Sequence, residues 1–326
     1  NFRSLGVKLS CFALLWLQRC TFGGGGGLLE KMWLFYYTIA LLLSLFVEGV
    51  TENRNSCGGP DESGSEKCII YYLHFHKTGG STVCTMAKNN QERVPEKGRN
   101  CNPSNDLEFY MKPTSVQNHE ILSSNVTFIA NEWRLGGEMI EDGMHFRFLT
   151  MLRDPLSRAH SHYHFSFSDT DRQYVPDEEK FVSALNDIGH SLQGDNSSNN
   201  STFVPWAWNS NFFTQGLTFG NKDNINCNHE LLKLAKRRLG LFTVMILEDL
   251  EKSKAVLRSV TDWENTSFYQ NSKENGKKSF KKTYSAEEYM LGNNHGEELA
   301  AFKNRNWCDY ELYNYARQLY SLPPVY

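Results

Sequence analysis

The sequence predicts an α/β fold, a single domain with a central parallel sheet flanked by helices. Apolar runs typical of buried strands alternate along the chain with segments that have helical patterning. A glycine-containing loop joins the first apolar run to a helix-like segment. No internal repeat is visible, and residues 67–326 are enough to form one sizeable domain.

Each expected element follows from local patterning. Short apolar runs predict strands at Cys68–Phe75, Val126–Ala130, Phe146–Leu152 and Phe242–Leu247. Helical patterning predicts helices at Val83–Asn89, from Pro155 to about Phe167, and at Phe181–Ile188, Glu230–Leu239, Asp249–Val260 and Ala286–Tyr320. Proline is tolerated in a first helical turn, and a polar break is expected at Gly292–Gly296. The polar segments 91–106 and 168–180 predict loops.

The N-terminal part divides by composition. The first methionine is Met32, and 15 uncharged residues follow at Trp33–Val47, whereas a membrane span needs about 20. This length suits a signal peptide as well as a short signal anchor, and both alternatives stay open. We therefore expect a possible leader or upstream translated segment at 1–31, a signal anchor or signal peptide at 32–50, a stem or linker at 51–66, and a lumenal domain at 67–326.

Two further features indicate the secretory lumen. Asn-x-Ser/Thr sequons, which are used only there, begin at Asn125, Asn196, Asn199, Asn200 and Asn265. Six cysteines follow the apolar segment, and an even number suits disulfides: Cys57, Cys68, Cys84, Cys101, Cys227 and Cys308. Six cysteines allow 15 pairings, among which the sequence does not choose. The net charge of −3 argues against general nucleic-acid binding.

The first loop has the composition of an anion site. Lys77, Thr78, Gly79, Gly80, Ser81 and Thr82 follow the strand Cys68–Phe75 and precede a helix. Glycines let backbone N–H groups converge, the helix N-terminus adds positive potential, and the lysine adds a full charge. A simple turn is the alternative interpretation.

A second anion-binding element comes about 70 residues later. Arg153 ends the third expected strand, and Ser161 lies about two turns into the following helix. An arginine fork and a hydroxyl at this place can hold a phosphate, with Arg158 as a third donor. A local salt bridge at a helix start is the alternative, and the joint occurrence of both elements favours a nucleotide with more than one anionic group.

Both elements resemble those of Golgi carbohydrate sulfotransferases. Lys77–Thr82 is similar to their 5′-phosphosulfate loop, and Arg153–Phe165 (Arg-Asp-Pro-x-x-Arg-x-x-Ser-x-Tyr-x-Phe) is similar to their 3′-phosphate element. The similarity is greatest to the heparan sulfate 2-O- and uronyl 2-O-sulfotransferases, with galactose 3-O-sulfotransferases next. Similarity to a substrate-side segment, a late strand and turn, and a closing helix extends it over about residues 68–320, at Asn209–Gly216, Phe242–Leu250 and Asp309–Ala316.

The resemblance implies a P-loop-like nucleotide-binding core and the donor 3′-phosphoadenosine-5′-phosphosulfate. The loop residues Lys77, Thr78, Gly79, Gly80, Ser81 and Thr82 would hold its 5′ end, and Arg153 with Ser161 its 3′-phosphate. Lys77 would also stabilise the bridging oxygen as the nucleotide leaves, and no metal is expected. Since the lysine precedes the glycines, the loop differs from a Walker A motif, which disfavours the alternative of a nucleotide-dependent kinase.

The general base is the point of departure from the family. The 2-O group uses a histidine near the strand after the first helix, whereas this chain has Glu132 at the end of Val126–Ala130 and no histidine there. Glu132 is the first candidate for the base, and His76 is the second. His160, His162 and His164 alternate on a helix and cannot all share one face, so we interpret them as partly structural, without a metal partner at matching spacing.

The resemblance implies a glycan acceptor, either a glycosaminoglycan or the sugar of a glycoprotein or glycolipid. A basic run could meet an anionic glycan, and tryptophans could stack on sugars, although a solvated segment and packing are the respective alternatives: Lys273, Lys277, Lys278, Lys281, Lys282, Trp133, Trp206 and Trp208. The expected location is the Golgi lumen, as a single-pass type II membrane protein or secreted after signal cleavage. An inactive relative that binds glycan or nucleotide is the main alternative function.

Overall fold

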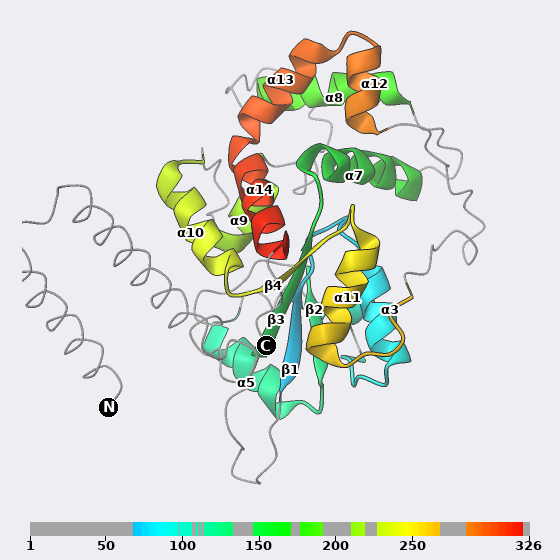
Figure 1. The fold of residues 1–326 in the computed structure, drawn as a ribbon, viewed down its shortest axis with the longest axis vertical. Coiled ribbons are helices and arrows are strands. Elements are labelled where there is room, and N and C mark those ends of the chain that lie inside the picture. The colour runs from blue at the N-terminus through cyan, green and yellow to red at the C-terminus, as the bar shows by residue number, and fades with distance from the viewer. Residues whose placement is uncertain are drawn as a thin grey trace, which may run out of the picture. The chain divides into compact units, whose positions relative to one another are not determined.

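The structure is a computed structural model, shown as a ribbon in Figure 1. It describes residues 68–96, 98–105, 109, 112, 114–132, 146–170, 177–191, 210–218, 227–267 and 285–321. The expected segments 1–31, 32–50 and 51–66 lie outside this part of the chain. Among the described residues, no helix is both long and apolar enough to cross a membrane.

A four-stranded parallel sheet forms the centre of the described domain, which confirms the predicted α/β class with helices flanking a parallel sheet. Its strands are β1 (Ile69–Leu73), β2 (Phe128–Asn131), β3 (Phe146–Leu152) and β4 (Thr243–Ile246), in the spatial order β2-β1-β3-β4. Since β1 pairs with both β2 and β3, the segments that follow these three strands emerge at the same edge of the sheet.

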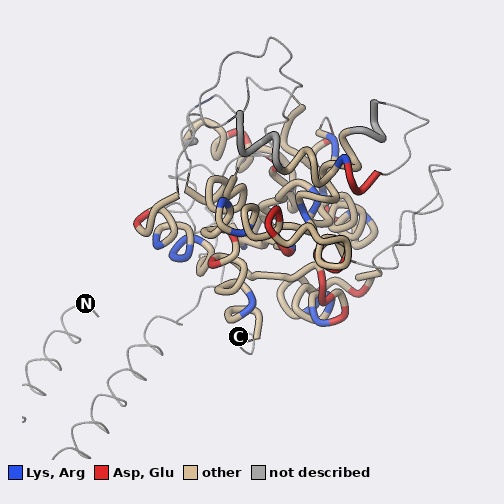
Figure 2. Tube along the Cα trace, turned by 90° about the horizontal axis from the view of Figure 1, so that it is seen from above, with Lys and Arg blue, Asp and Glu red and all other residues tan. Residues whose placement is uncertain are grey.

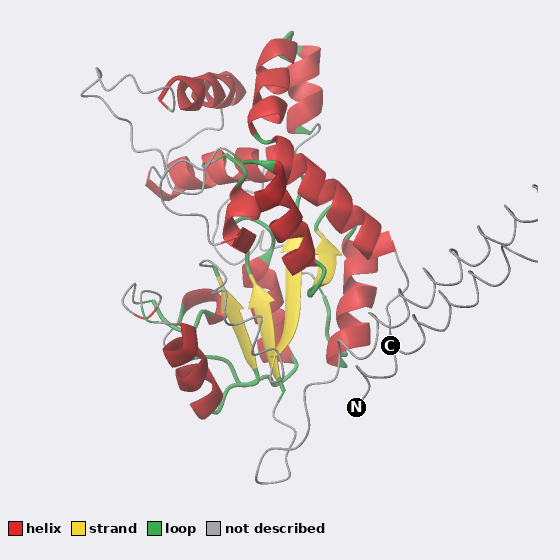
Figure 3. Ribbon diagram, turned by 90° about the vertical axis from the view of Figure 1, so that its left-hand side faces the viewer, coloured by secondary structure: helices red, strands yellow, loops and turns green. Residues whose placement is uncertain are grey.

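The helices follow the strands in the expected alternation. They are α3 (Gly80–Asn89), the 3-10 turn η1 (Arg99–Cys101), α5 (Thr114–Ser123), α7 (Pro155–Thr170), α8 (Glu178–Ser191), α9 (Phe212–Thr218), α10 (His229–Leu239), α11 (Leu250–Thr261), α12 (Ala286–Gly292), α13 (Gly296–Arg305) and α14 (Trp307–Ser321). Figure 3 shows helices on both sides of the strands.

Both faces of the sheet are buried, as the continuous apolar run of β1 requires. Ile69, Tyr71 and Leu73 pack on one face against residues of α5, α9, α10 and α14. Ile70 and Tyr72 pack on the other face against α3 and α11, which lie side by side in Figure 1. A separate apolar cluster joins α7, α8, α12 and α13.

Several element boundaries differ from the sequence prediction. The helix after the glycine loop begins at Gly80 rather than Val83, so that the loop residues Gly80–Thr82 form its first turn. The helix predicted at Phe181–Ile188 begins three residues earlier, at Glu178. Helices α5 and α9 were not predicted, and Asn306 separates α13 from α14 at a break that the sequence did not indicate.

Two disulfides join elements within the described residues. Cys84 of α3 bonds Cys101 of η1, and Cys227 bonds Cys308 of α14. These pairs confirm the prediction that cysteines form disulfides. They identify two of the cysteine pairings that the sequence left open. Figure 2 shows basic and acidic positions mixed along the described helices, in agreement with the small net charge.

Candidate functional site

The loop between β1 and α3 has an unusual backbone. Lys77 and Gly79 both adopt left-handed conformations, with φ of 69° and 93°. Thr78 closes the loop, because its N–H and its hydroxyl both donate to the carbonyl of Phe75, at 3.1 and 2.6 Å. The Thr78 side chain is fully buried, so its hydroxyl shapes the loop and does not face solvent.

This backbone leaves N–H groups available at the helix start. Within the part of the chain that the structure describes, the N–H groups of Gly79 and Ser81 have no acceptor. Unpaired N–H groups at a helix N-terminus favour binding of an anion. The Ser81 hydroxyl is exposed and donates to Asn100 Oδ1 at 3.1 Å, while Thr82 is half-buried.

His74 supports the loop through a hydrogen bond to its backbone. The N–H of Gly80 donates to His74 Nε2 at 3.0 Å, so this nitrogen is unprotonated and the ring proton is on Nδ1. His74 Nδ1 lies 2.9 Å from Glu132 Oε1. A Cβ at position 80 would lie 2.0 Å from the imidazole, so only glycine allows this approach. His74 was not predicted as a site residue from the sequence.

Glu132 lies at the end of β2, at the edge where the loop begins. Asn102 contacts it twice: Asn102 Nδ2 donates to Glu132 Oε2 at 3.3 Å, and the Glu132 N–H donates to Asn102 Oδ1 at 2.9 Å. Burial acts to raise the pKa of Glu132, but the hydrogen bond from His74 and the nearby His74 and His76 hold that pKa below its ordinary value. An ionised, doubly held carboxylate suits the orientation of His74 better than proton abstraction.

His76 lies on the other side of the loop and contacts α7. Its Nδ1 is 2.8 Å from His162 Nδ1, and its ring packs edge-on against Phe165. Burial and the charge of Lys77 lower the pKa of His76 to about 4. Burial and the neighbouring His76 lower the pKa of His162 to about 3. Both imidazoles are therefore neutral near pH 7, with one donating to the other.

The two predicted anion elements meet in space. Arg153 Nη1 donates to the carbonyl of Lys77 at 3.4 Å, across a sequence separation of 76 residues. Glu248, after β4, lies 3.9 Å from Arg153 Nε and accepts from the N–H of Asp154 and from Tyr313. Burial lowers the pKa of Arg153, against the opposing effect of Glu248. Lys77 Nζ lies 4.0 Å from the centre of the ring of Phe165, which is a residue of α7.

The other two members of the second element differ in exposure. The Ser161 side chain is partly exposed, and it makes no hydrogen bond to any described residue. Arg158 is buried, with its guanidinium 4.3 Å from the centre of the Phe212 ring. Burial lowers the pKa of Arg158 to about 10, and the nearby Asp309 opposes this effect. Arg158 therefore contributes positive potential from inside the domain.

The structure does not describe the residues that were predicted to contact the sugar. The lysine run and the three tryptophans fall outside the residues that the structure describes: Lys273, Lys277, Lys278, Lys281, Lys282, Trp133, Trp206 and Trp208. Two sequon asparagines that are described, Asn125 and Asn265, are exposed, as glycosylation requires.

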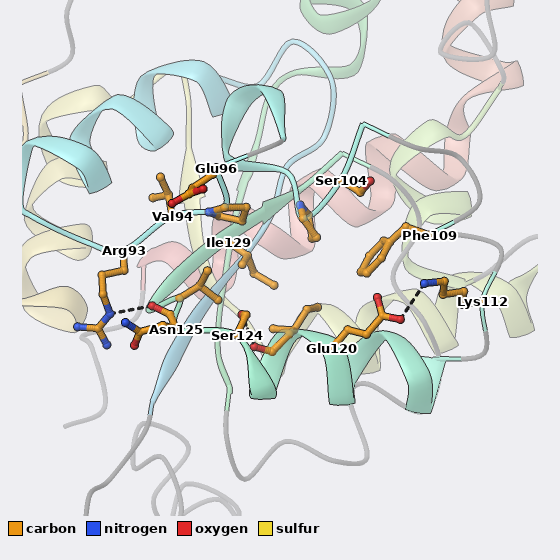
Figure 4. Close-up of a pocket in the computed structure, with 14 residues that line it drawn as sticks. Arg93, Val94, Glu96, Ser104, Phe109, Lys112, Glu120, Ser124, Asn125 and Ile129 are labelled. Carbon is orange, nitrogen blue, oxygen red and sulfur yellow. Dashed lines mark hydrogen bonds and ion pairs between the residues drawn. The ribbon is translucent and has the colours of Figure 1, made fainter.

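A cavity of about 790 Å³ lies beside the edge strand β2 (Figure 4). It is lined by residues of α5 and the segments around Arg93 and Ser104, and an ion pair of 2.7 Å joins Lys112 to Glu120 at its wall. None of the loop residues 76–82 lines it. We therefore place the candidate anion site at the loop, where charge and N–H groups converge, rather than in this cavity.

Comparison of the sequence with protein-family models and with curated proteins gives no match. The geometry of the loop and of Arg153 consequently carries the functional argument. His74 and Glu248, which support the predicted residues, were not predicted from the sequence, and His162 was interpreted only as partly structural. The position of Glu248 directly after an apolar strand was the available signal, because α/β sheets place ligand-binding groups at strand ends.

Proposed function

We propose that this protein is a sulfotransferase that moves sulfate from 3′-phosphoadenosine-5′-phosphosulfate to a sugar hydroxyl of a glycan. The contact between Arg153 and the Lys77 carbonyl is the observation that carries this proposal. It joins a phosphate-type loop to a second cationic element, which suits a nucleotide with anionic groups at both its 5′ and 3′ ends. The loop and β1–α3 would then act as a P-loop-like nucleotide-binding core.

The residues divide between the two ends of the donor. The N–H groups of Gly79 and Ser81 and the Lys77 ammonium would bind the 5′-phosphosulfate, with Gly80 and Thr78 fixing the loop and Thr82 lying in the same turn. Arg153 and the Ser161 hydroxyl would bind the 3′-phosphate. The buried Arg158 adds to the positive potential that attracts the donor.

Transfer would proceed by in-line attack of the sugar hydroxyl on sulfur. Sulfuryl transfer is analogous to phosphoryl transfer, in which positioning and electrostatic stabilisation supply most of the catalysis. The S–O bond to the nucleotide breaks as the new S–O bond forms, and Lys77 stabilises the negative charge that develops on the leaving phosphate oxygen. A base accepts the proton of the hydroxyl.

We infer that His76, rather than Glu132, is this base. Glu132 is held by His74 and Asn102, whereas His76 is a neutral imidazole beside Lys77 with His162 to orient it. The charged or titratable groups that face His76 are Lys77, His74, Glu132, Arg158 and His162. The negative charge of a bound donor opposes Lys77 and Arg158, so the pKa of His76 should rise from about 4 towards its ordinary value in the donor complex.

The test is transfer of radiolabelled sulfate from the donor to a panel of desulfated glycans by the full chain. We expect transfer that falls at least 100-fold in Lys77→Ala and His76→Asn, and less in Glu132→Gln. Lys88→Ala is the matched control, since Lys88 is an exposed lysine at the far end of α3. Because the base must be neutral, kcat should fall as pH decreases through the pKa of His76. This decrease of kcat at acid pH should be absent in His76→Asn.

Other outcomes would replace the proposal. Tight binding of 3′,5′-adenosine bisphosphate without transfer to any glycan would support a binding-only relative. Activity that needs ATP and magnesium would support a kinase, and no nucleotide binding would exclude both. The lumenal, membrane-anchored location is part of the same proposal, and the two disulfides and the exposed sequon asparagines support it.

A further inference from the structure

Helix α7 presents a second group of histidines away from the loop. His160 and His164 are four residues apart and therefore share one face of the helix, whereas His162 contacts His76. Glu178, in the first turn of α8, lies against this pair. No metal partner at matching spacing is expected from the sequence, whereas the structure places the Glu178 carboxylate beside both rings.

Three ligand-type atoms converge at this place. His160 Nε2 lies 2.6 Å from Glu178 Oε2 and 2.8 Å from His164 Nε2. His164 Nε2 lies 3.7 Å from Glu178 Oε1. Donor atoms around a tetrahedral Zn²⁺ are about 3.3 Å apart, as follows from bonds of about 2.0–2.2 Å. The observed separations lie on both sides of this value.

Hydrogen bonding accounts for only part of this arrangement. An imidazole nitrogen carries either one proton or one lone pair in the ring plane. His160 Nε2 can therefore make one strong hydrogen bond, yet both Glu178 and His164 lie within hydrogen-bond distance of it. A cation between the three atoms would accept a lone pair from each ligand and would satisfy all three contacts.

The surroundings are those of a built site rather than of a surface cluster. The side chains of His160, His164 and Glu178 are 6%, 16% and 12% exposed. Phe181 of α8 packs edge-on against His160 at 4.7 Å, and Tyr163 packs against His164 at 5.3 Å. Aromatic rings that fix the orientation of the imidazoles would hold the ligand atoms in place.

We propose that His160, His164 and Glu178 bind a divalent transition metal of the zinc class. Two histidines and one glutamate form a ligand set found in zinc proteins, and imidazole favours Zn²⁺ over Mg²⁺ or Ca²⁺. The metal would fasten α8 to α7 and would so fix the helix that carries Ser161 and His162. It takes no part in sulfate transfer, and its existence does not depend on the proposed function.

Metal content and affinity of the tag-free full chain test this proposal. We expect about one zinc per chain after purification, and rebinding of Zn²⁺ to the chelator-treated protein in competition with a chromophoric chelator. His160→Gln and His164→Gln should each weaken Zn²⁺ binding at least 100-fold, since removal of a ligand exceeds the 10–100-fold effect of its supporting groups. His295→Gln is the matched control, because His295 pairs with the adjacent Glu179 at 3.3 Å.

A third variant separates ligation from folding. In His164→Cys the Co²⁺-loaded protein should gain thiolate-to-metal charge-transfer absorption, which only a cysteine bound to the metal produces. The proposal is overturned if the wild-type chain neither contains nor binds Zn²⁺ or Co²⁺, or if both glutamine variants bind Zn²⁺ as the wild type does. Absence of the charge-transfer band in a folded, Co²⁺-binding His164→Cys chain would equally exclude His164 as a ligand.

Discussion

Gly80 is required by the position of His74. The imidazole accepts the Gly80 N–H and occupies the space where a Cβ would lie, with a separation of 2.0 Å. Gly80→Ala must move the buried ring or the first turn of α3. We expect the free energy of unfolding to fall by about 1–3 kcal/mol, the usual range for overpacking, as measured by urea unfolding.

Gly292→Ala is the control for this substitution. It adds the same methyl group in a helix where no atom lies within 4 Å of the new Cβ. Its stability should be unchanged or slightly higher, because alanine is the better helix former. Equal losses in the two variants would contradict the steric role of Gly80.

The neutral state of His76 predicts a sensitivity to acid. Its pKa is about 4 in the folded chain and about 6.5 when unfolded. Below pH 6.5 the unfolded chain therefore binds a proton that the folded chain does not, and stability is lost as pH falls from 6.5 towards 4. Screening of this partly exposed ring limits the loss to about 1–2 kcal/mol.

The comparison is between the wild type and His76→Asn, with unfolding by urea at pH 7 and at pH 5. The difference between the two pH values should be smaller in the variant, whatever its stability at pH 7. Identical pH dependence in both chains would show that His76 is protonated in the folded state at pH 5.

The role of some residues is visible in sequence and that of others is not. Lys77 and Arg153 could be identified because they follow apolar strands, and parallel strands end at a common edge. His74 gave no signal, since its function depends on the close approach of Gly80. The spacing of His160 and His164 predicts that they lie on one helix face. The contact of Glu178 with His160 could not be predicted, because it depends on how α8 packs against α7.

At the scale of elements, helix α9 depends on a distant residue. Asp309 of α14 is buried and accepts from the N–H groups of Phe213 and Thr214 and from the Thr214 hydroxyl, at 2.8–2.9 Å. These bonds satisfy the free N–H groups at the start of α9. Asp309→Ala should lower the free energy of unfolding by about 2–4 kcal/mol, because it leaves buried donors without an acceptor.

Glu311→Ala, two residues later on α14, is the matched control. Glu311 is 54% exposed and forms an ion pair with Lys236 at 3.3 Å. Such surface pairs contribute about 0–1 kcal/mol, so a small change is expected. Urea unfolding of both variants makes the measurement, and similar effects would contradict the capping role of Asp309.

The same contact explains why α9 was missed by sequence reasoning. Its start is defined by Asp309, 95–96 residues away, rather than by a local capping residue. Helix α5 was missed because its polar sequence lacks a clear apolar face, and its Val116 is exposed. The strands were predicted correctly because each is a short apolar run, and α10 was predicted because its apolar residues follow the helix period.

At the scale of the whole molecule, the two disulfides close loops of different length. Cys84–Cys101 spans 17 residues, and Cys227–Cys308 spans 81. Loop-closure entropy assigns about 3 kcal/mol to the first and about 4.5 kcal/mol to the second. Paired serine substitutions should therefore destabilise the chain more at positions 227 and 308, and urea unfolding of the two double variants would test the order. The reverse order would indicate that local packing outweighs loop closure.

The donor site depends on parts of the chain that only the folded domain brings together. A ligand at 100 times its Kd stabilises the folded state by about 2.7 kcal/mol, so 3′,5′-adenosine bisphosphate should raise the Tm. Lys77→Ala and Arg153→Ala should each reduce this shift, and Lys88→Ala should leave it unchanged.

Since Arg153 donates to the Lys77 carbonyl, replacing either residue should also disturb the position of the other. The double variant should then lose less binding free energy than the sum of the two single losses, because residues in contact are not independent. Strictly additive losses would mean that the loop and Arg153 bind the nucleotide separately. The contact between Arg153 and Lys77 would then have no effect on nucleotide binding.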